Sequence, residues 1–306
     1  MTRVNVKKLH TLTGHSDCVY TLQQGGEPNL FFSGAGDGQV VLWDLRKPEL
    51  GQLIARLPNS IYTLHYLKES DLLVVGHNYE GVHLLDWRAK KEIGSLQITS
   101  SSIFDACSLG KELFVASGDG SVTVVDLTTW SIRKKVGLSG KSARVLAINP
   151  AQGELAVGYS DHSIRILDLG DLSLKYEWFG HRNSVFTLAY SPDFKTLLSG
   201  SRDAHLKAWD PLHQYRQAGE VVAHLYAINH IAYSPDGKHF VTCSLDKSIK
   251  VWKADDLTLL KVIDKSRHAG HGTSVNKLLW TPFDRALVSA SDDRTISVWN
   301  IIFNQD

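Results

Sequence analysis

One set of four residues occurs four times along the chain with the same spacing. A His is followed 18 residues later by Ser or Thr, 22 residues later by Asp and 28 residues later by Trp. The four sets are His15, Ser33, Asp37, Trp43; His181, Ser199, Asp203, Trp209; His224, Thr242, Asp246, Trp252; and His271, Ser289, Asp293, Trp299. Agreement at three offsets in four places means that one structural unit is repeated.

The Trp positions give the length of this unit. Trp209 and Trp252 are 43 residues apart, and Trp252 and Trp299 are 47 apart. The 166 residues between Trp43 and Trp209 hold four further steps, so seven units fill the chain. Each ends in a segment in which apolar and other residues alternate, the pattern of a strand: VVLWD, VHLLD, VTVVD, IRILD, LKAWD, IKVWK and ISVWN.

The repeat resembles the WD-repeat (WD40) β-propeller family. The residues that carry the likeness are Gly14-His15, Trp43-Asp44, Gly180-His181, Trp209-Asp210, Gly270-His271 and the turns Ser191-Pro192-Asp193 and Ser234-Pro235-Asp236-Gly237. The resemblance implies an all-β, seven-bladed propeller of four-stranded antiparallel blades, with residues 1–306 as a single domain. It also implies closure of the ring by the N-terminal strand, residues 4–9, against the strand that ends near Ile301.

Composition narrows the classes of partner and compartment. The net charge of +1 argues against bulk electrostatic binding to nucleic acid or to a membrane surface. There is no apolar run of the roughly 18 residues that a membrane span needs, and the first ten residues lack the apolar core of a signal peptide. The three cysteines, Cys18, Cys107 and Cys243, include no CxxC pair. Free thiols in a reducing compartment, the cytoplasm, are therefore expected.

The repeated sets combine Ser, His and Asp, the residue types of a nucleophilic triad. An enzyme needs such a constellation once, whereas here it recurs on four separate units, which favours a structural role. The family resemblance implies a hydrogen-bonded chain from Asp to His to Ser or Thr to the Trp indole, satisfying polar groups that are costly to bury alone. We expect no catalytic residue and no cofactor. The short spacing between His268 and His271, without a nearby acidic cluster, predicts no metal site.

Units two to four depart from the set. Apolar residues replace most of its members, and we expect these blades to depend on apolar packing and to be the less rigid half of the ring. The residues at the equivalent positions are Leu57, Val75, Tyr79 and Leu85 in the second unit, Val115, Asp119 and Val125 in the third, and Val157, Asp161 and Leu167 in the fourth.

One face of the propeller is a candidate binding surface. In WD-repeat proteins, the residue after the first aliphatic position of each innermost strand lies beside the mouth of the central channel. Aromatic residues and Arg are enriched at interaction hot spots, and both occur in this ring. The predicted ring is Tyr20, Tyr62, Phe104, Arg144, Phe186, Asn229 and Asn276, with Arg202 and Leu245 extending the same face. The alternative is that the aromatic rings simply pack between neighbouring blades.

The resemblance implies a non-enzymatic scaffold that binds a protein or peptide at the aromatic-lined channel mouth, without membrane or nucleic-acid partners. An enzyme or small-molecule binder that uses the central channel is the alternative, which converging carboxylates or His residues at the mouth would favour. A third reading is a structural subunit of a large assembly. It predicts several apolar surface patches, including one at Trp130 and one at Trp178.

Overall fold

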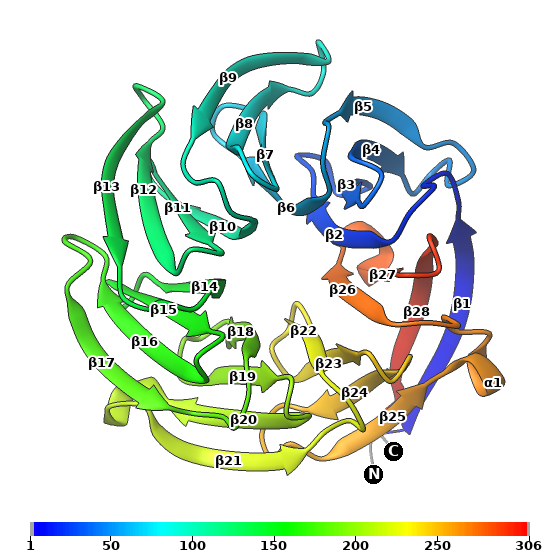
Figure 1. Cartoon of the computed structure of the whole chain (residues 1–306). Coiled ribbons are helices and arrows are strands. Elements are labelled where there is room, and N and C mark those ends of the chain that lie inside the picture. Colours follow the sequence, from blue (N-terminus) through cyan, green and yellow to red (C-terminus); the bar gives the residue numbers. More distant parts are fainter. Residues whose placement is uncertain (1–2, 305–306) are drawn as a thin grey trace.

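Seven four-stranded antiparallel sheets stand around a central opening (Figure 1). The computed structural model describes residues 3–304. Each sheet is one blade, and in six blades the strands run in chain order from the opening to the periphery; in blade seven, β1 is the outer strand. This arrangement confirms the predicted fold class.

Blades one to four take the sequence in order. Blade one comprises β2 (Val19–Gln24), β3 (Leu30–Ala35), β4 (Gln39–Asp44) and β5 (Gln52–Arg56). Blade two comprises β6 (Ile61–Leu67), β7 (Leu72–His77), β8 (Gly81–Asp86) and β9 (Lys91–Gln97). Blade three comprises β10 (Ile103–Leu109), β11 (Glu112–Ser117), β12 (Ser121–Asp126) and β13 (Ser131–Gly137). Blade four comprises β14 (Ala143–Asn149), β15 (Glu154–Tyr159), β16 (Ser163–Asp168) and β17 (Leu174–Phe179).

The last three blades complete the ring. Blade five comprises β18 (Val185–Tyr190), β19 (Leu197–Ser201), β20 (His205–Asp210) and β21 (Arg216–Val222). Blade six comprises β22 (Ile228–Tyr233), β23 (His239–Ser244), β24 (Ile249–Lys253) and β25 (Leu259–Ile263). Blade seven comprises β26 (Val275–Trp280), β27 (Leu287–Ser291), β28 (Ile296–Asn304) and β1 (Arg3–Leu12).

The two ends of the chain meet in blade seven. Strand β1 pairs antiparallel with β28, and Val4 lies opposite Phe303 and Val6 opposite Ile301. The predicted closure by residues 4–9 is therefore confirmed. Because β1 is the outer strand of a blade whose other strands come from the other end of the chain, this pairing ties the ring into a closed circle.

The hydrophobic core lies in the layers between neighbouring blades. Val19 of blade one and Val288 of blade seven, for example, belong to one buried cluster. Small residues on the second strands let the next blade come close: a Cβ atom at Gly34 would lie 2.6 Å from Cγ2 of Ile61. A Cβ at Gly200 would meet Ile228 at 2.7 Å in the same way. These glycines are thus required by packing and not by backbone conformation.

Among residues 3–304, helical structure is confined to single turns between strands. They are η1 (Pro211–His213), α1 (Lys265–His268) and η2 (Phe283–Arg285). Within residues 3–304 there is no helix with the length and apolar character needed to cross a membrane. The cysteines are unpaired: Cys243 is buried, and Cys18 and Cys107 are half-buried.

Candidate binding site at the channel mouth

Each repeated polar set forms a continuous hydrogen-bonded chain. In blade five, the Trp209 indole N–H donates to Ser199 Oγ over 2.8 Å, and Ser199 Oγ lies 2.7 Å from His181 Nε2. His181 Nδ1 lies 3.1 Å from Asp203 Oδ2, so this network assigns the ring proton to Nδ1. Blades one, six and seven repeat the chain at distances of 2.7–3.2 Å.

Burial of the polar chain determines the charge states of its His and Asp residues. Burial lowers the pKa of His181 below its ordinary value, so the imidazole is neutral at neutral pH. Burial opposes ionisation of Asp203, but hydrogen bonds from His181 and from the Arg182 backbone hold the pKa of that carboxyl well below its usual range. Asp203 therefore stays charged and fastens the β19–β20 turn to the loop that enters the blade.

Blades three and four keep more of this network than the sequence predicted. Thr99 Oγ1 donates to Asp119 over 2.9 Å, and Ser139 Oγ donates to Asp161 over 2.7 Å. Shorter hydroxyl side chains thus bind the turn carboxylate in place of the His. The prediction that these blades depend on apolar packing instead is wrong at Asp119 and Asp161. It holds at the buried Val115, Val125, Val157 and Leu167.

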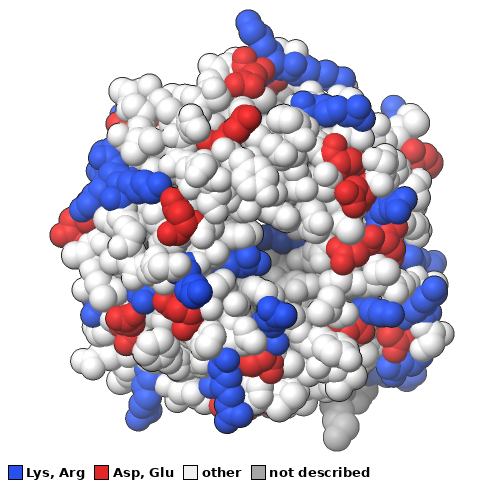
Figure 2. All heavy atoms as spheres, viewed as in Figure 1, with Lys and Arg blue, Asp and Glu red and all other residues white. Residues whose placement is uncertain are grey.

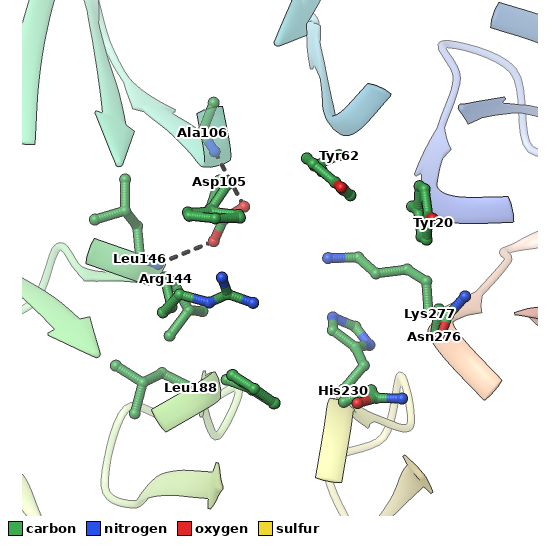
Figure 3. Close-up of a pocket in the computed structure, with 14 residues that line it drawn as sticks. Tyr20, Tyr62, Asp105, Ala106, Arg144, Leu146, Leu188, His230, Asn276 and Lys277 are labelled. Atoms are coloured by element: carbon green, nitrogen blue, oxygen red, sulfur yellow. Dashed lines mark hydrogen bonds between the residues drawn. The ribbon is translucent and has the colours of Figure 1, made fainter. Parts of the chain in front are cut away.

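All seven predicted ring residues line one cavity of about 430 Å³ at the centre of the propeller (Figure 3). Their side chains are half-buried, and none is enclosed between blades. The prediction that they gather at the channel is confirmed; their role in binding stays a prediction. The residues are Tyr20, Tyr62, Phe104, Arg144, Phe186, Asn229 and Asn276.

A β-bulge at each ring position explains this placement. On every innermost strand, the pairing register shifts across the ring residue, for example between Val19 and Thr21 and between Ile103 and Asp105. The extra residue of a bulge is left out of the ladder and its side chain is turned away from the regular alternation. As a result, two consecutive residues, Phe104 and Asp105, both face the channel.

The aromatic members of the ring are in contact with one another. The ring centroids of Tyr20 and Tyr62 are 4.9 Å apart, and those of Tyr62 and Phe104 are 5.8 Å apart. The Arg144 guanidinium carbon lies 3.9 Å from the Phe104 centroid and 4.8 Å from the Phe186 centroid. The five side chains form a continuous arc, which we call the aromatic arc, over blades one to five.

The two Asn residues of the ring join blades. Asn229 Nδ2 donates to the Val275 carbonyl over 2.8 Å, and Asn276 Nδ2 donates to the Val19 carbonyl over 3.0 Å. Their amide groups are engaged with the neighbouring inner strand. The side chains free to meet a partner are therefore those of the aromatic arc.

Three charged or titratable residues lie deeper in the same cavity: Asp105, His230 and Lys277. Each directly follows a ring residue in the sequence. Asp105 accepts a hydrogen bond from the Leu146 backbone over 2.9 Å, and His230 Nδ1 accepts one from the Leu278 backbone over 3.3 Å. Both groups thereby hold neighbouring blades together. Lys277 extends into the opening opposite Arg144 (Figure 3).

The cavity carries a net positive charge. Burial raises the pKa of Asp105 and lowers that of His230, which weakens the single negative charge and keeps the imidazole neutral. Among residues 3–304, neither Arg144 nor Lys277 forms an ion pair within 4.0 Å, although Lys277 is close enough to act on the Asp105 pKa. Figure 2 shows Lys and Arg atoms in the central opening and mixed charges farther out.

Arg202 and Leu245 lie outside the lining of the cavity. Both are exposed residues of the turns between the second and third strands of blades five and six. Leu245, 49% exposed, lies near Leu225 and Tyr226, which are 82% and 60% exposed and are not among the predicted site residues. The residues after the equivalent His in the other three sets are Ser16-Asp17, Arg182-Asn183 and Gly272-Thr273, so the large apolar pair after His224 was a signal available in the sequence.

The surface Trp residues of the third reading do not form exposed patches. The ring centroid of Trp178 lies 5.2 Å from that of Trp209 and 5.4 Å from that of Tyr215. Trp130 packs half-buried against the core between blades two and three.

The fold and its polar chains define a class of protein: a closed seven-bladed propeller with a side-chain-lined central channel. The chain belongs to the WD40-repeat family. The family model described as "WD domain, G-beta repeat" matches residues 6–44, 172–210, 216–253 and 264–300, half of the chain. The longest unmatched stretch, 45–171, contains blades two and three and the first three strands of blade four, which are the blades that depart from the repeated set.

Relatives and solved structures agree with this assignment. The chain is 25% identical over 210 residues to periodic tryptophan protein 2 of Arabidopsis thaliana, covering 65% of this chain and 23% of that protein. It is 24% identical over 172 residues to WD repeat-containing protein SL1-17 of Schistosoma mansoni, covering 56% and 57%. The WD40 β-propeller domain of Doa1 superposes with a TM-score of 0.86 at 17% identity, covering 96% of this chain and 97% of that chain. The chain thus spans less than two thirds of each of these two curated relatives.

Proposed function

We propose that this protein is a non-enzymatic interaction scaffold that takes a carboxylate-bearing peptide segment of a partner protein at the channel mouth. WD40 propellers generally serve as protein-interaction scaffolds, which supports the general class. The observation that carries the specific proposal is the position of Arg144. Its guanidinium is held between two aromatic faces at the mouth, with no carboxylate of residues 3–304 within 4.0 Å.

Burial makes this unpaired charge costly. It lowers the pKa of Arg144, which nevertheless remains protonated at any physiological pH. A carboxylate from a partner would supply the missing counter-charge in bidentate geometry, and Lys277 deeper in the channel would add to the attraction. The Tyr20, Tyr62, Phe104 and Phe186 rings supply contact area at low entropic cost.

The enzyme alternative has less support. The deeper residues Asp105 and His230 are both titratable, but each already accepts a backbone hydrogen bond from the next blade. They do not face each other as an acid–base pair within hydrogen-bonding distance. We also propose a cytoplasmic location, on the basis of three unpaired cysteines in the described chain.

The experiment compares the wild-type protein with a Tyr62→Ala, Phe186→Ala double variant. Both are titrated against a panel of fluorescent peptides rich in Asp and Glu together with their Asn and Gln counterparts, and partners captured from the native cell are identified in parallel. We expect binding of an acidic peptide that its amide counterpart and the double variant both lose. An Ile132→Ala, Leu174→Ala variant, altered at exposed positions of outer strands, serves as the control. Equal binding by the double variant would place the partner elsewhere.

A further inference from the structure

Blade two carries an unusual pair of histidines where the repeated polar set is missing. His77 ends β7 and His83 lies on β8. His83 is directly opposite Val75, the residue at the Ser position of the set. Residues two apart on a strand share a face, so His77 and His83 lie on the face that carries Val75 and Leu85. The pair therefore stands beside the place where other blades hold their polar chain.

The two imidazoles point their outer nitrogens at each other. His77 Nε2 and His83 Nε2 are 2.7 Å apart, and the ring centroids are 4.7 Å apart. Glu80, in the turn between the strands, brings Oε2 to 3.4 Å from His77 Nε2 and 3.9 Å from His83 Nε2. The ligand atoms of the three residues all lie within 4.8 Å of one another.

A change of turn geometry positions Glu80. In the other six blades, the left-handed residue of this turn follows the Asp position; these residues are Gly38, Gly120, His162, Ala204, Lys247 and Arg294. In blade two it comes one residue earlier, at Tyr79 with φ of 74°, and Gly81 then adopts φ of 137°. The turn thus differs from all its counterparts at the residue that faces the two imidazoles.

We propose that His77, Glu80 and His83 bind a divalent transition-metal ion, for which Zn²⁺ is the natural probe, and that the ion clamps the β7–β8 turn. The circle through the three ligand atoms has a radius of about 2.0 Å, which matches Zn–N and Zn–O bond lengths. Two imidazoles and one carboxylate form a donor set that such ions favour. The clamp takes the place of the Asp–His–Ser–Trp chain that blade two lacks.

The surroundings of the histidines fit this role. His77 is fully buried, so its ring is held in place by the surrounding side chains. Nδ1 of both rings is buried without a hydrogen-bond partner among residues 3–304. His83 Nδ1 forms no hydrogen bond with the described residues but lies 3.4 Å from Glu92 Oε1, the carboxylate to which a metal-bound His83 would donate its second N–H.

The local charge also favours a cation. Glu80 and Glu92 place two carboxylates beside the two imidazole rings. In the described part of the chain, their ion-pair partners within 4.0 Å are these two imidazoles and no Lys or Arg. A divalent cation between the rings would give these carboxylates a positive counterpart.

The test is calorimetric titration of chelator-treated full-length protein with zinc chloride at pH 7.5. We expect one equivalent to bind, His83→Gln to abolish this binding, Glu80→Gln to weaken it at least tenfold, and Glu92→Gln to weaken it about tenfold. His213→Gln is the matched control, because His213 also lies beside a carboxylate, Asp210, but on the exposed surface. It should leave zinc binding unchanged.

Thermal melting gives a second readout. Zinc should raise the melting temperature of the wild type and of His213→Gln but not that of His83→Gln, with circular dichroism confirming that each variant folds. Because Glu80 is 54% exposed, Glu80→Gln tests the site even if His83→Gln fails to fold. Absence of zinc binding in the wild type, or unchanged affinity in Glu80→Gln, would overturn the proposal.

Discussion

The Arg144 guanidinium carbon lies 3.9 Å from the centre of the Phe104 ring and 4.8 Å from that of Phe186. The three side chains come from the innermost strands of three consecutive blades. A planar cation between two aromatic faces is pre-oriented, so little conformational entropy is lost when it meets a carboxylate. This relationship makes Arg144 the most specific element of the proposed binding face.

Replacing Arg144 by Lys should therefore weaken partner binding although the charge is kept. A lysine ammonium cannot form the bidentate pair or stack as a plane, and we expect a loss of about 1 kcal/mol, roughly fivefold in Kd. Arg144→Met, which removes the charge, should cost more and should reduce the salt dependence of binding. Titration of the identified acidic peptide at two salt concentrations measures both effects. Equal affinities of wild type and Arg144→Met would remove Arg144 from the interface.

The ring residues could be predicted from the sequence because each follows a recognisable aliphatic position on an innermost strand. Lys277, Asp105 and His230 could not. In a regular strand, the residue after a channel-facing one points the other way, and only the bulge at each ring position lets two successive side chains face the channel. A bulge does not change apolar periodicity enough to be read from one chain.

The blade-two histidines were missed for a related reason. His268 and His271 were the histidines to consider as a metal pair from the sequence alone, because they are close along the chain. His77 and His83 meet only because they lie across a hairpin, and Glu80 reaches them only through a turn that departs from its six counterparts. The hydrogen bonds of Thr99 to Asp119 and of Ser139 to Asp161 were missed as well, because the repeated set predicts a His as the partner of the turn Asp.

The polar chain of blade five should contribute measurably to the free energy of unfolding. Asp203→Ala removes the acceptor of the His181 N–H in a buried setting, and we expect a cost of about 1–3 kcal/mol. Asp255→Ala, at an exposed site where the carboxylate only approaches Lys253, should cost at most about 0.5 kcal/mol. Chemical denaturation measures both variants. Similar values for the two would mean that the chain contributes nothing beyond a surface charge.

Closure of the ring can be tested with adjacent residues of β1. Val4 is buried against the core between blades six and seven, whereas the Asn5 side chain faces solvent. Val4→Asp should therefore destabilise the protein and promote association through the exposed edge of β28, and Asn5→Asp should leave stability and oligomeric state unchanged. Thermal melting and size-exclusion chromatography provide the readouts. A monomeric Val4→Asp variant with an unchanged melting temperature would contradict the closure.

Acid should destabilise the fold before its carboxylates titrate. Burial lowers the pKa of His15, His181 and His224 below the ordinary value, and that of His65 to about 4. Because these groups bind protons more readily in the unfolded chain, they contribute stability that is fully present above about pH 6.5 and is lost as the pH falls toward their folded values.

The free energy of unfolding should accordingly be level between pH 7.5 and about 7, and should fall steadily from about pH 6.5 toward pH 4. Denaturant titrations at half-unit intervals measure this profile. His65→Gln can keep a hydrogen bond to Ser108 but cannot take up a proton, so it should show a shallower fall than the wild type. The exposed His213→Gln should follow the wild-type profile. Stability that rises on acidification would instead mean that the Asp partners hold the buried imidazoles in the charged form, which is opposite to the direction that burial imposes.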